Sequence, residues 1–276
     1  MTTELEAGVN GLNLEEENKQ TPQPSRPQKG AKQQRGGRGN ESPTTQLSKA
    51  LSYILRHGTL KEGLKVRTDG YVPLDDVLAR PKVAKIKLER GKTPSLEDVR
   101  QIVDSNDKKR FEMIQKDDIW LIRALQGHSI ANVTELDHVP ITLDNLHILA
   151  EEKEDVTLAK DTLPTGVEIL HGTNKEAWEK ILSSGGLNRM KRNHIHLAKG
   201  RPGSSNVISG MRSSSQVILH IDIVAALRQG DIPFSMASNG AVLTSGQGDT
   251  GILPLKFITK AEEGKSGKLI WQNAIE

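Results

Sequence analysis

One stretch decides how the first half of this chain folds: Leu47-Ser48-Lys49-Ala50-Leu51-Ser52-Tyr53-Ile54-Leu55-Arg56-His57. Its apolar residues recur at the spacing of a single buried stripe on a helix. Arg56 then lies on the polar side of that helix, and His57 lies at the seam between core and solvent. A guanidinium matches phosphate oxygens, and an imidazole can hold or pass a proton near neutral pH. The pair indicates either a phosphate-binding group or two cations that merely favour the dipole at a helix end.

Composition limits the class of protein. The 276 residues suffice for two ordinary domains. No apolar run reaches membrane-spanning length and no secretory segment follows Met1, so we expect an intracellular protein, cytoplasmic or nuclear, with no membrane partner. The absence of cysteine excludes disulfides, a thiol nucleophile and a cysteine-type zinc site.

Two segments are unusual in charge and composition. Residues 1–45 hold too few apolar side chains to offset the entropy of ordering, so they are expected to form a disordered tail. The tail contains Arg35-Gly36-Gly37-Arg38-Gly39, which either attracts nucleic acid weakly or does nothing. Residues 82–92 carry five cations and one acid, Glu89. That run indicates either attraction to a polyanion or a solvated loop.

The pattern over residues 46–136 predicts three helices followed by a hairpin. Thr44-Thr45 is the expected cap of the first helix, and residues 64–66 are expected to form a short strand. A second helix follows Pro73, and a third begins at Ser95, whose spacing to Asp98 resembles a capping box. Residues 110–114 and 119–123 read as paired strands. This order is the outline of a winged-helix domain, which licenses no function by itself.

The second half follows a predicted connector over residues 137–165, and its expected secondary structure differs from that of the first half. Residues 166–276 read as short strands around one helix that Asn174 caps and Gly185-Gly186 ends. The expected strands cover residues 167–171, 194–197, 207–209, 216–222, 241–244 and 255–259. The fold class predicted for the whole chain is therefore α+β, with a mostly antiparallel sheet in the second domain.

Three short segments of this second half have residues suited to chemistry. His171-Gly172-Thr173 is expected at a strand-to-helix turn, where glycine permits close approach and a helix N-terminus favours an anion. Arg192, His194 and His196 are expected on one face of a strand, which suits a polyanion, a nucleotide or a metal ion. Because no third carboxylate ligand is evident, no metal is expected. Ser209-Gly210-Met211-Arg212-Ser213-Ser214-Ser215 offers many donors for an anion or a ribose, or is only a surface loop.

Motifs of several enzyme classes are missing. The chain has no dinucleotide-binding glycine fingerprint and no Walker A sequence, so neither a Rossmann nor a P-loop site is supported. It also lacks the signatures of serine hydrolases, kinases and zincins.

Taken together, the segments resemble the RNA 2′-phosphotransferase family, NAD-dependent enzymes that remove the splice-junction 2′-phosphate from tRNA. The resemblance runs from about Leu47 to about Phe257. It is carried by Leu47–Ser52 with Leu55-Arg56-His57, Asp69-Gly70-Tyr71, Asn106–Phe111, Gln126-Gly127-His128-Ser129, His171-Gly172-Thr173, Met190–Leu197 and Ser209–Ser215. Seven motifs in one order make a specific signal, although no single one does.

The resemblance implies a winged-helix RNA lobe joined to a lobe related to ADP-ribosyltransferases. It implies that the RNA 2′-phosphate attacks the ribose of NAD, the co-substrate, and expels nicotinamide. The ribose 2″-hydroxyl then attacks the phosphate, which gives RNA with a free 2′-hydroxyl and ADP-ribose 1″,2″-cyclic phosphate. By motif position, the catalytic residues are Arg56, His57, Arg110 and Arg192. The NAD pocket falls on His171, Gly172, Thr173, His194, His196, Ser209, Gly210 and Arg212, with a third signature position expected at Val242.

Physical chemistry agrees with that division of roles. A phosphate monoester is largely dianionic at neutral pH, so the first step needs orientation more than deprotonation. The second step concentrates charge at phosphorus, where arginines can stabilise it, and His57 is the candidate for proton handling. The partners expected are 2′-phosphorylated tRNA or RNA and NAD, bound by a monomer. The alternatives are ADP-ribosyl transfer to nucleic-acid terminal phosphates, a non-catalytic reader of RNA phosphate or ADP-ribose, and a metal nuclease using the two histidines.

Overall fold

The computed structural model describes residues 41–106, 108–150, 161–201, 211–212 and 214–274. The expected tail over residues 1–40 and the expected strand over 207–209 lie outside the described residues. Both predicted domains fall within one unit, Glu41–Glu276. Mixed helices and mostly antiparallel sheets confirm the predicted α+β class.

The first helix, α1 (Pro43–Tyr53), carries the apolar stripe that the sequence predicted, but it begins earlier than expected. The side chain of Ser42 accepts a hydrogen bond from the Thr45 backbone N–H at 3.2 Å, so Ser42 is the cap. Residues 43–45, which were assigned to the disordered tail, are therefore helical. After Tyr53 the chain widens into a π-helical turn, η1 (Ile54–Gly58), where a regular α-helix was predicted. Such turns commonly occur at functional sites.

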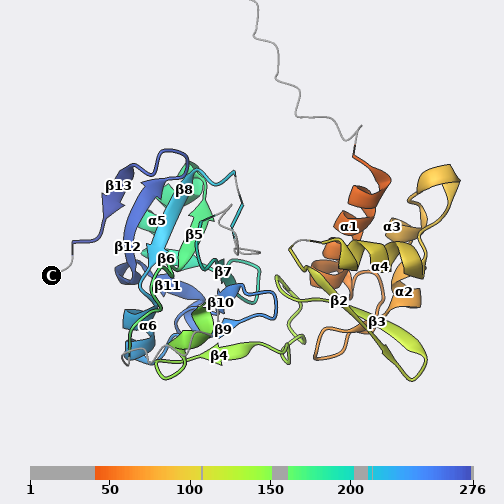
Figure 1. The fold of residues 1–276 in the computed structure, drawn as a ribbon, viewed down its shortest axis with the longest axis horizontal. Coiled ribbons are helices and arrows are strands. Elements are labelled where there is room, and N and C mark those ends of the chain that lie inside the picture. The colour runs from red at the N-terminus through yellow and green to blue at the C-terminus, as the bar shows by residue number, and fades with distance from the viewer. Residues whose placement is uncertain (1–40, 107, 151–160, 202–210, 213, 275–276) are drawn as a thin grey trace, which may run out of the picture. The chain divides into compact units, whose positions relative to one another are not determined.

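Four helices and a small sheet make up the first half of the described chain (Figure 1). After α1 and η1 come β1 (Val72–Pro73), α2 (Leu74–Leu78), α3 (Pro81–Ala84), η2 (Glu89–Gly91), α4 (Leu96–Asp104), β2 (Phe111–Lys116) and β3 (Ile119–Ala124). The capping box between Ser95 and Asp98 and the hairpin are confirmed, with strand order β1-β3-β2. Helix α3 was not predicted. The strand expected at residues 64–66 is wrong, because the Leu64 N–H bonds to the Thr59 carbonyl at 2.8 Å and closes a turn.

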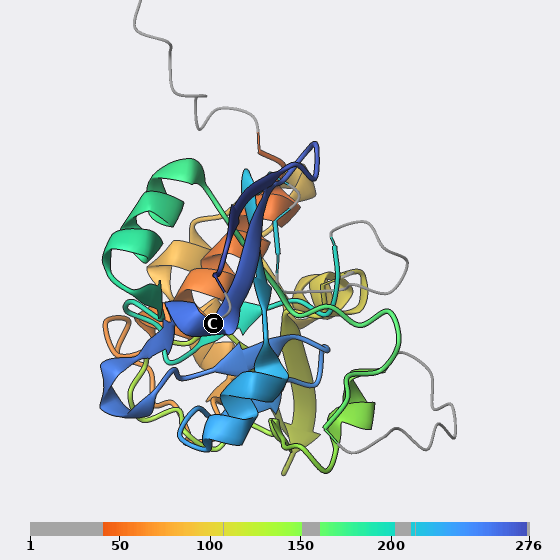
Figure 2. The same cartoon turned by 90° about the vertical axis from the view of Figure 1, so that its left-hand side faces the viewer.

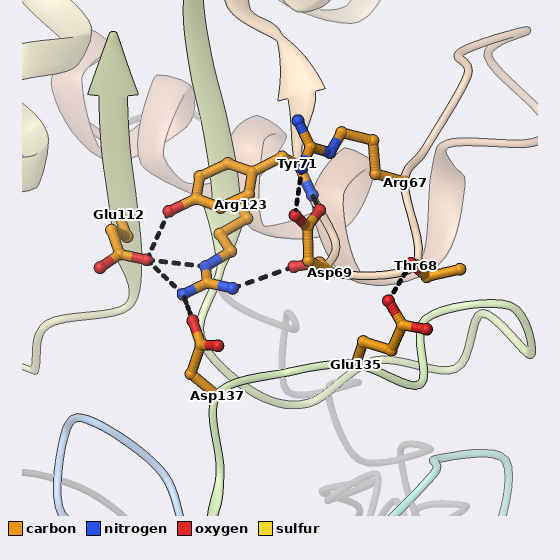
Figure 3. A network of polar contacts seen from close by, with 8 residues as sticks. All are labelled: Arg67, Thr68, Asp69, Tyr71, Glu112, Arg123, Glu135 and Asp137. Atoms are coloured by element: carbon orange, nitrogen blue, oxygen red, sulfur yellow. Dashed lines mark hydrogen bonds and ion pairs between the residues drawn. The ribbon is translucent and has the colours of Figure 1, made fainter. Parts of the chain in front are cut away.

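A charged network around the buried Arg123 ties three parts of this half together (Figure 3). The guanidinium of Arg123 donates to Glu112 at 2.7 Å, to the Asp69 carbonyl at 3.1 Å and to Asp137 at 2.6 Å. The Tyr71 hydroxyl also donates to Glu112, at 2.7 Å, and its ring lies 4.4 Å from the Arg123 guanidinium carbon. Arg123 is 4 % exposed, so its side chain belongs to the interior and not to the hairpin surface. The motif residues Asp69 and Tyr71 thus have a structural role.

The second half is built from antiparallel strands (Figures 1 and 2). Its elements are β4 (Val139–Ile141), η3 (Leu146–Leu149), β5 (Leu170–Thr173), α5 (Lys175–Ser183), β6 (Gly186–Asn188), β7 (Ile195–Leu197), β8 (Val217–Ile221), α6 (Ile223–Gln229), β9 (Phe234–Met236), β10 (Val242–Thr244), η4 (Gly248–Thr250), β11 (Ile252–Pro254), η5 (Leu255–Phe257), β12 (Ile258–Glu263) and β13 (Leu269–Gln272). Two four-stranded sheets have the orders β4-β9-β10-β7 and β13-β12-β8-β5. Both contribute side chains to one apolar core, together with Trp178 and Ile181 of α5.

The sequence located four of these strands within a few residues and missed others. Strands β5, β7, β8 and β10 overlap their predicted ranges, and α5 begins after its predicted cap, Asn174. Residues 255–257 form a 3-10 turn, and the strand β12 begins only at Ile258. Helix α6 and the strands β6, β9, β11 and β13 were not predicted. The expected connector contributes β4, which pairs with β9.

Candidate active site

Arg56 and His57 lie in the π-helical turn η1 and are held by the segment that follows the hairpin. The Ser129 N–H donates to the Arg56 carbonyl at 2.9 Å, and the Ser129 hydroxyl bonds to Nδ1 of His57 at 2.9 Å. Gly127, with φ of 85°, lies so close that a β-carbon there would be 3.5 Å from Cδ of Arg56. These contacts hold the Arg56 side chain in place. On the His57 ring they involve Nδ1 and not Nε2.

Arg110 and Arg192 both lie within electrostatic reach of Arg56 in this turn. Burial, and then the charges of Arg110 and Arg192, lower the pKa of Arg56 to about 10. Nε of Arg56 is buried without a hydrogen-bond partner among the described residues. Like charges gathered in a partly buried place repel one another and are costly unless an anion joins them. The arrangement therefore suits a ligand with several anionic oxygens, and cations at a helix end alone do not explain it.

Two asparagines of the second half attach the segments that carry the other arginines. The Asn193 N–H donates to the His128 carbonyl at 2.8 Å, and Nδ2 of Asn193 donates to the carbonyls of Ile130 at 3.2 Å and Val133 at 3.3 Å. Asn193 is the neighbour of Arg192, so these bonds hold Arg192 near the segment that binds the η1 turn.

Asn239, which is 3 % exposed, makes the corresponding attachment beside Arg110. Its Nδ2 donates to the carbonyls of Lys108 at 3.4 Å and Lys109 at 3.2 Å. The Arg110 side chain itself donates to Asn106 at 3.1 Å. The positions of Arg110 and Arg192 thus depend on contacts between residues far apart in sequence.

The prediction that Arg192, His194 and His196 share one strand face is wrong for Arg192, and His194 also lies just outside the strand. Strand β7 begins only at Ile195, and Arg192 lies in the preceding turn, where its N–H donates to the Arg189 carbonyl at 3.2 Å. Arg192 nevertheless lies close enough to Arg56 and His57 to lower the pKa of both. The turn brings it there, which strand periodicity could not indicate.

Histidines line the neighbourhood of the three arginines, and burial lowers the pKa of each. Nδ1 of His171 bonds to the His196 carbonyl at 2.9 Å. Burial, followed by the charges of Arg192 and Arg56, lowers the pKa of His196 to about 3, and its Nδ1 is buried without a partner among the described residues. His194 packs edge-on against His138, with ring centroids 5.7 Å apart, and its pKa falls to about 4, chiefly through burial. Neutral imidazoles thus lie within electrostatic reach of these arginines.

Comparison with known proteins identifies the family to which this geometry belongs. Residues 42–246 match the model of "RNA 2′-phosphotransferase, Tpt1 / KptA family". The chain belongs to this family. Among curated relatives, tRNA 2′-phosphotransferase 1 of Danio rerio is 38% identical over 84% of this chain and 91% of its own length. The Homo sapiens protein of that name is 40% identical over 83% and 82%, and the Saccharomyces cerevisiae tRNA 2′-phosphotransferase is 34% identical over 78% and 82%.

The family match spans every segment that carries a predicted site residue, although not all of them lie as expected. His171, Gly172 and Thr173 lie within strand β5, where a strand-to-helix turn was predicted. A β-carbon at Gly172 would lie 2.3 Å from Cγ of Met211, so this glycine is required by packing within the protein and not by a ligand alone. The α5 N-terminus was expected to hold an anion. Its Lys175 and Ala177 N–H groups already bond to the side chains of Gln216 and Asn174.

The remaining predicted positions of the NAD pocket lie on a loop and on β10. Ser209 and Gly210 lie outside the described residues, and Arg212 is exposed. Val242, the expected third signature position, lies on β10 with its side chain fully buried in the core. Leu243 is paired with His196 across the β10–β7 ladder, so Leu243 and His196 share a face of the sheet.

His128 and Ser129 lie in one of the family motifs, but the sequence predicted no role for either residue. His128 is 2 % exposed, and its pKa falls to about 3 because of burial and then the charge of Arg56. Asn193 lies inside another of the family motifs, and Asn239 lies in none of them. The bonds of both asparagines join distant segments, so no local pattern marked them.

The described ranges hold neither a metal-binding cluster nor a membrane-spanning helix. Within them, no group of three or more histidine, aspartate or glutamate side chains is arranged to hold a metal ion. No helix among those residues is both long and apolar enough to span a bilayer.

Proposed function

We propose that this protein removes the 2′-phosphate from ligated tRNA by transferring it to NAD. The phosphate oxygen attacks the nicotinamide-bearing ribose carbon of NAD, and nicotinamide leaves. The 2″-hydroxyl of that ribose then attacks phosphorus, and the RNA 2′-oxygen leaves with a proton. The products are nicotinamide, RNA with a 2′-hydroxyl and ADP-ribose 1″,2″-cyclic phosphate. Family membership and the names of the relatives support removal of a tRNA 2′-phosphate.

The observation that carries the proposal is the half-buried Arg56, which has a buried Nε without a partner among the described residues and lies close enough to Arg110 and Arg192 for their charges to lower its pKa. Three guanidinium forks can hold the three terminal oxygens of a phosphate monoester and stabilise the charge that develops at phosphorus. The unpartnered Nε of Arg56 provides one donor already turned away from water. In this assignment the helix-rich first half, with α4 and the β2–β3 hairpin in a winged-helix arrangement, supplies the RNA side of the site.

His57 is the proton-handling group in this proposal. Burial and the adjacent charges of Arg192 and Arg56 lower its pKa, so the imidazole is neutral at neutral pH. In this role Nδ1–H donates to the Ser129 hydroxyl oxygen, so Nε2 carries the lone pair that accepts the proton of the attacking 2″-hydroxyl and returns it to the departing RNA 2′-oxygen. His57 therefore serves the second step, whereas the dianionic phosphate needs no base in the first.

The second half supplies groups suited to NAD. NAD contributes an electrophilic ribose carbon with nicotinamide as the leaving group. His171 and His196 are linked by a hydrogen bond, and Nδ1 of His196 is a buried polar atom that lacks a partner among the described residues. A buried group of this kind is costly unless something binds it. We therefore assign His171, Gly172, Thr173, His194 and His196 to the NAD side, with Ser209, Gly210 and Arg212 completing it.

The test is incubation of the protein with a short RNA that bears one internal 2′-phosphate, with and without NAD, followed by identification of every phosphorus-containing product. The proposal expects ADP-ribose 1″,2″-cyclic phosphate and 2′-hydroxyl RNA only when NAD is present. Release of inorganic phosphate without NAD would contradict it. ADP-ribose retained on RNA, with no cyclic phosphate, would indicate a terminal-phosphate ADP-ribosyltransferase instead.

A further inference from the structure

The segment that starts in α3 and runs toward α4 presents a cationic surface that the proposed catalytic chemistry does not use. We call residues 82–92 the basic loop. Its five cations are exposed, and none forms an ion pair with another described residue; they are Lys82, Lys85, Lys87, Arg90 and Lys92. Glu89 is its single acid. An unpaired cluster of this density carries a local positive potential that attracts a polyanion.

The basic loop is anchored to the core, so its charges are displayed on a defined surface. Val83 is fully buried, and Ile86 and Leu88 pack against the same apolar cluster. The Ile86 N–H bonds to the Val83 carbonyl at 2.9 Å, and the Leu88 N–H bonds to the Lys92 carbonyl at 2.9 Å. Because the apolar side chains point inward, the intervening lysines face solvent together.

This surface adjoins the turn that carries Arg56 and His57. Nζ of Lys82 lies 4.1 Å from the centre of the Tyr53 ring. That ring in turn covers Gly58, the last residue of η1, where a β-carbon would come within 2.8 Å of Cε1. One aromatic side chain therefore links the basic loop to the catalytic turn.

We propose that the basic loop binds the sugar-phosphate backbone of the RNA at nucleotides remote from the one that carries the 2′-phosphate. The inference rests on the proposed function for the identity of the polyanion. A strand whose 2′-phosphate lies among the three arginines passes next to Tyr53 and Lys82, and its further phosphates then meet the exposed cations. Phosphate contacts of this kind raise affinity without reading sequence. The loop therefore favours long or structured RNA over a short oligonucleotide.

The test compares two triple variants that each lose three positive charges. The first is Lys85→Gln/Lys87→Gln/Lys92→Gln. The matched control, Lys256→Gln/Lys265→Gln/Lys268→Gln, removes three exposed lysines from the second half. Both are assayed for dephosphorylation of a full-length 2′-phosphorylated tRNA and of a 2′-phosphorylated trinucleotide, and for binding of unmodified tRNA over a range of salt concentrations.

The expected result is a loss of roughly 10-fold or more in kcat/KM on the tRNA for the loop variant, with the trinucleotide unchanged and the control like the parent. The slope of log affinity against log salt should fall by about 2 to 3, since each phosphate contact contributes about 0.7 to 0.9. Equal losses on both RNAs, or a loop variant that binds unmodified tRNA like the control, would overturn the inference. Because the binding assay needs no reaction, an inactive parent protein would refute the proposed function and still leave the surface testable.

Discussion

Replacement of Asn193 by alanine tests how the three arginines are kept together. The change removes the two hydrogen bonds from Nδ2 to the carbonyls of Ile130 and Val133, while the backbone bond to His128 remains. At a net value of about 0.5 to 1.5 kcal/mol for each bond, the attachment loses about 1 to 3 kcal/mol. If that free energy holds Arg192 beside Arg56, kcat/KM should fall roughly 5- to 150-fold, since about 1.4 kcal/mol is a factor of ten.

The control for Asn193→Ala is Asn145→Ala. Asn145 also makes two side-chain bonds, with the Thr142 N–H at 2.7 Å and the Pro140 carbonyl at 2.8 Å, but it lies away from the arginines. Both variants are compared in thermal unfolding and in steady-state kinetics on 2′-phosphorylated RNA. We expect both to be destabilised and only Asn193→Ala to lose activity. Equal activity of the two variants would refute the reasoning, as would full additivity of Asn193→Ala with Arg56→Ala in a double-mutant cycle.

Three further predictions concern single positions. Ser95→Ala should lower the free energy of unfolding by about 1 kcal/mol without changing kcat, because it removes the cap of α4, and denaturant titration would show this. Gly172→Ala should raise the KM for NAD more than that for RNA, because its β-carbon would collide with Met211; equal changes would contradict the assignment. The pKa of His128 falls from 6.5 to about 3, so the folded protein resists protonation there. Below pH 6.5 this residue should lower the free energy of unfolding by up to about 1.4 kcal/mol per pH unit. A His128→Gln variant should show a smaller slope of unfolding free energy against pH.

Local sequence patterns predicted the elements that form from residues close together in the chain. The stripe in α1, the capping box at Ser95 and the hairpin all depend on residues a few positions apart, and all three are confirmed. Helix α3 escaped notice because its four residues are too few to show a period. Strands such as β9 and β11 have three residues each, and they form because partners far along the chain pair with them.

The candidate site likewise combines residues that the sequence predicted with contacts that it could not predict. Motif resemblance selected Arg56, Arg110 and Arg192, and the structure brings their charges together. Strand periodicity placed Arg192 on β7, but it reaches the cluster from a turn whose neighbour, Asn193, bonds to residues about 60 positions earlier. Contacts of that range follow from the packing of the whole chain, and no window of sequence contains them.

The central claim is that Arg56, Arg110 and Arg192 bind a single phosphate with His57 alongside. A crystal structure of the protein with an oligonucleotide that carries one 2′-phosphate tests it most directly. We predict that all three guanidinium groups donate to that phosphate at about 2.7 to 2.9 Å, the length of charge-assisted hydrogen bonds. A 2′-phosphate bound elsewhere, or contacted by only one of the three arginines, would contradict the claim.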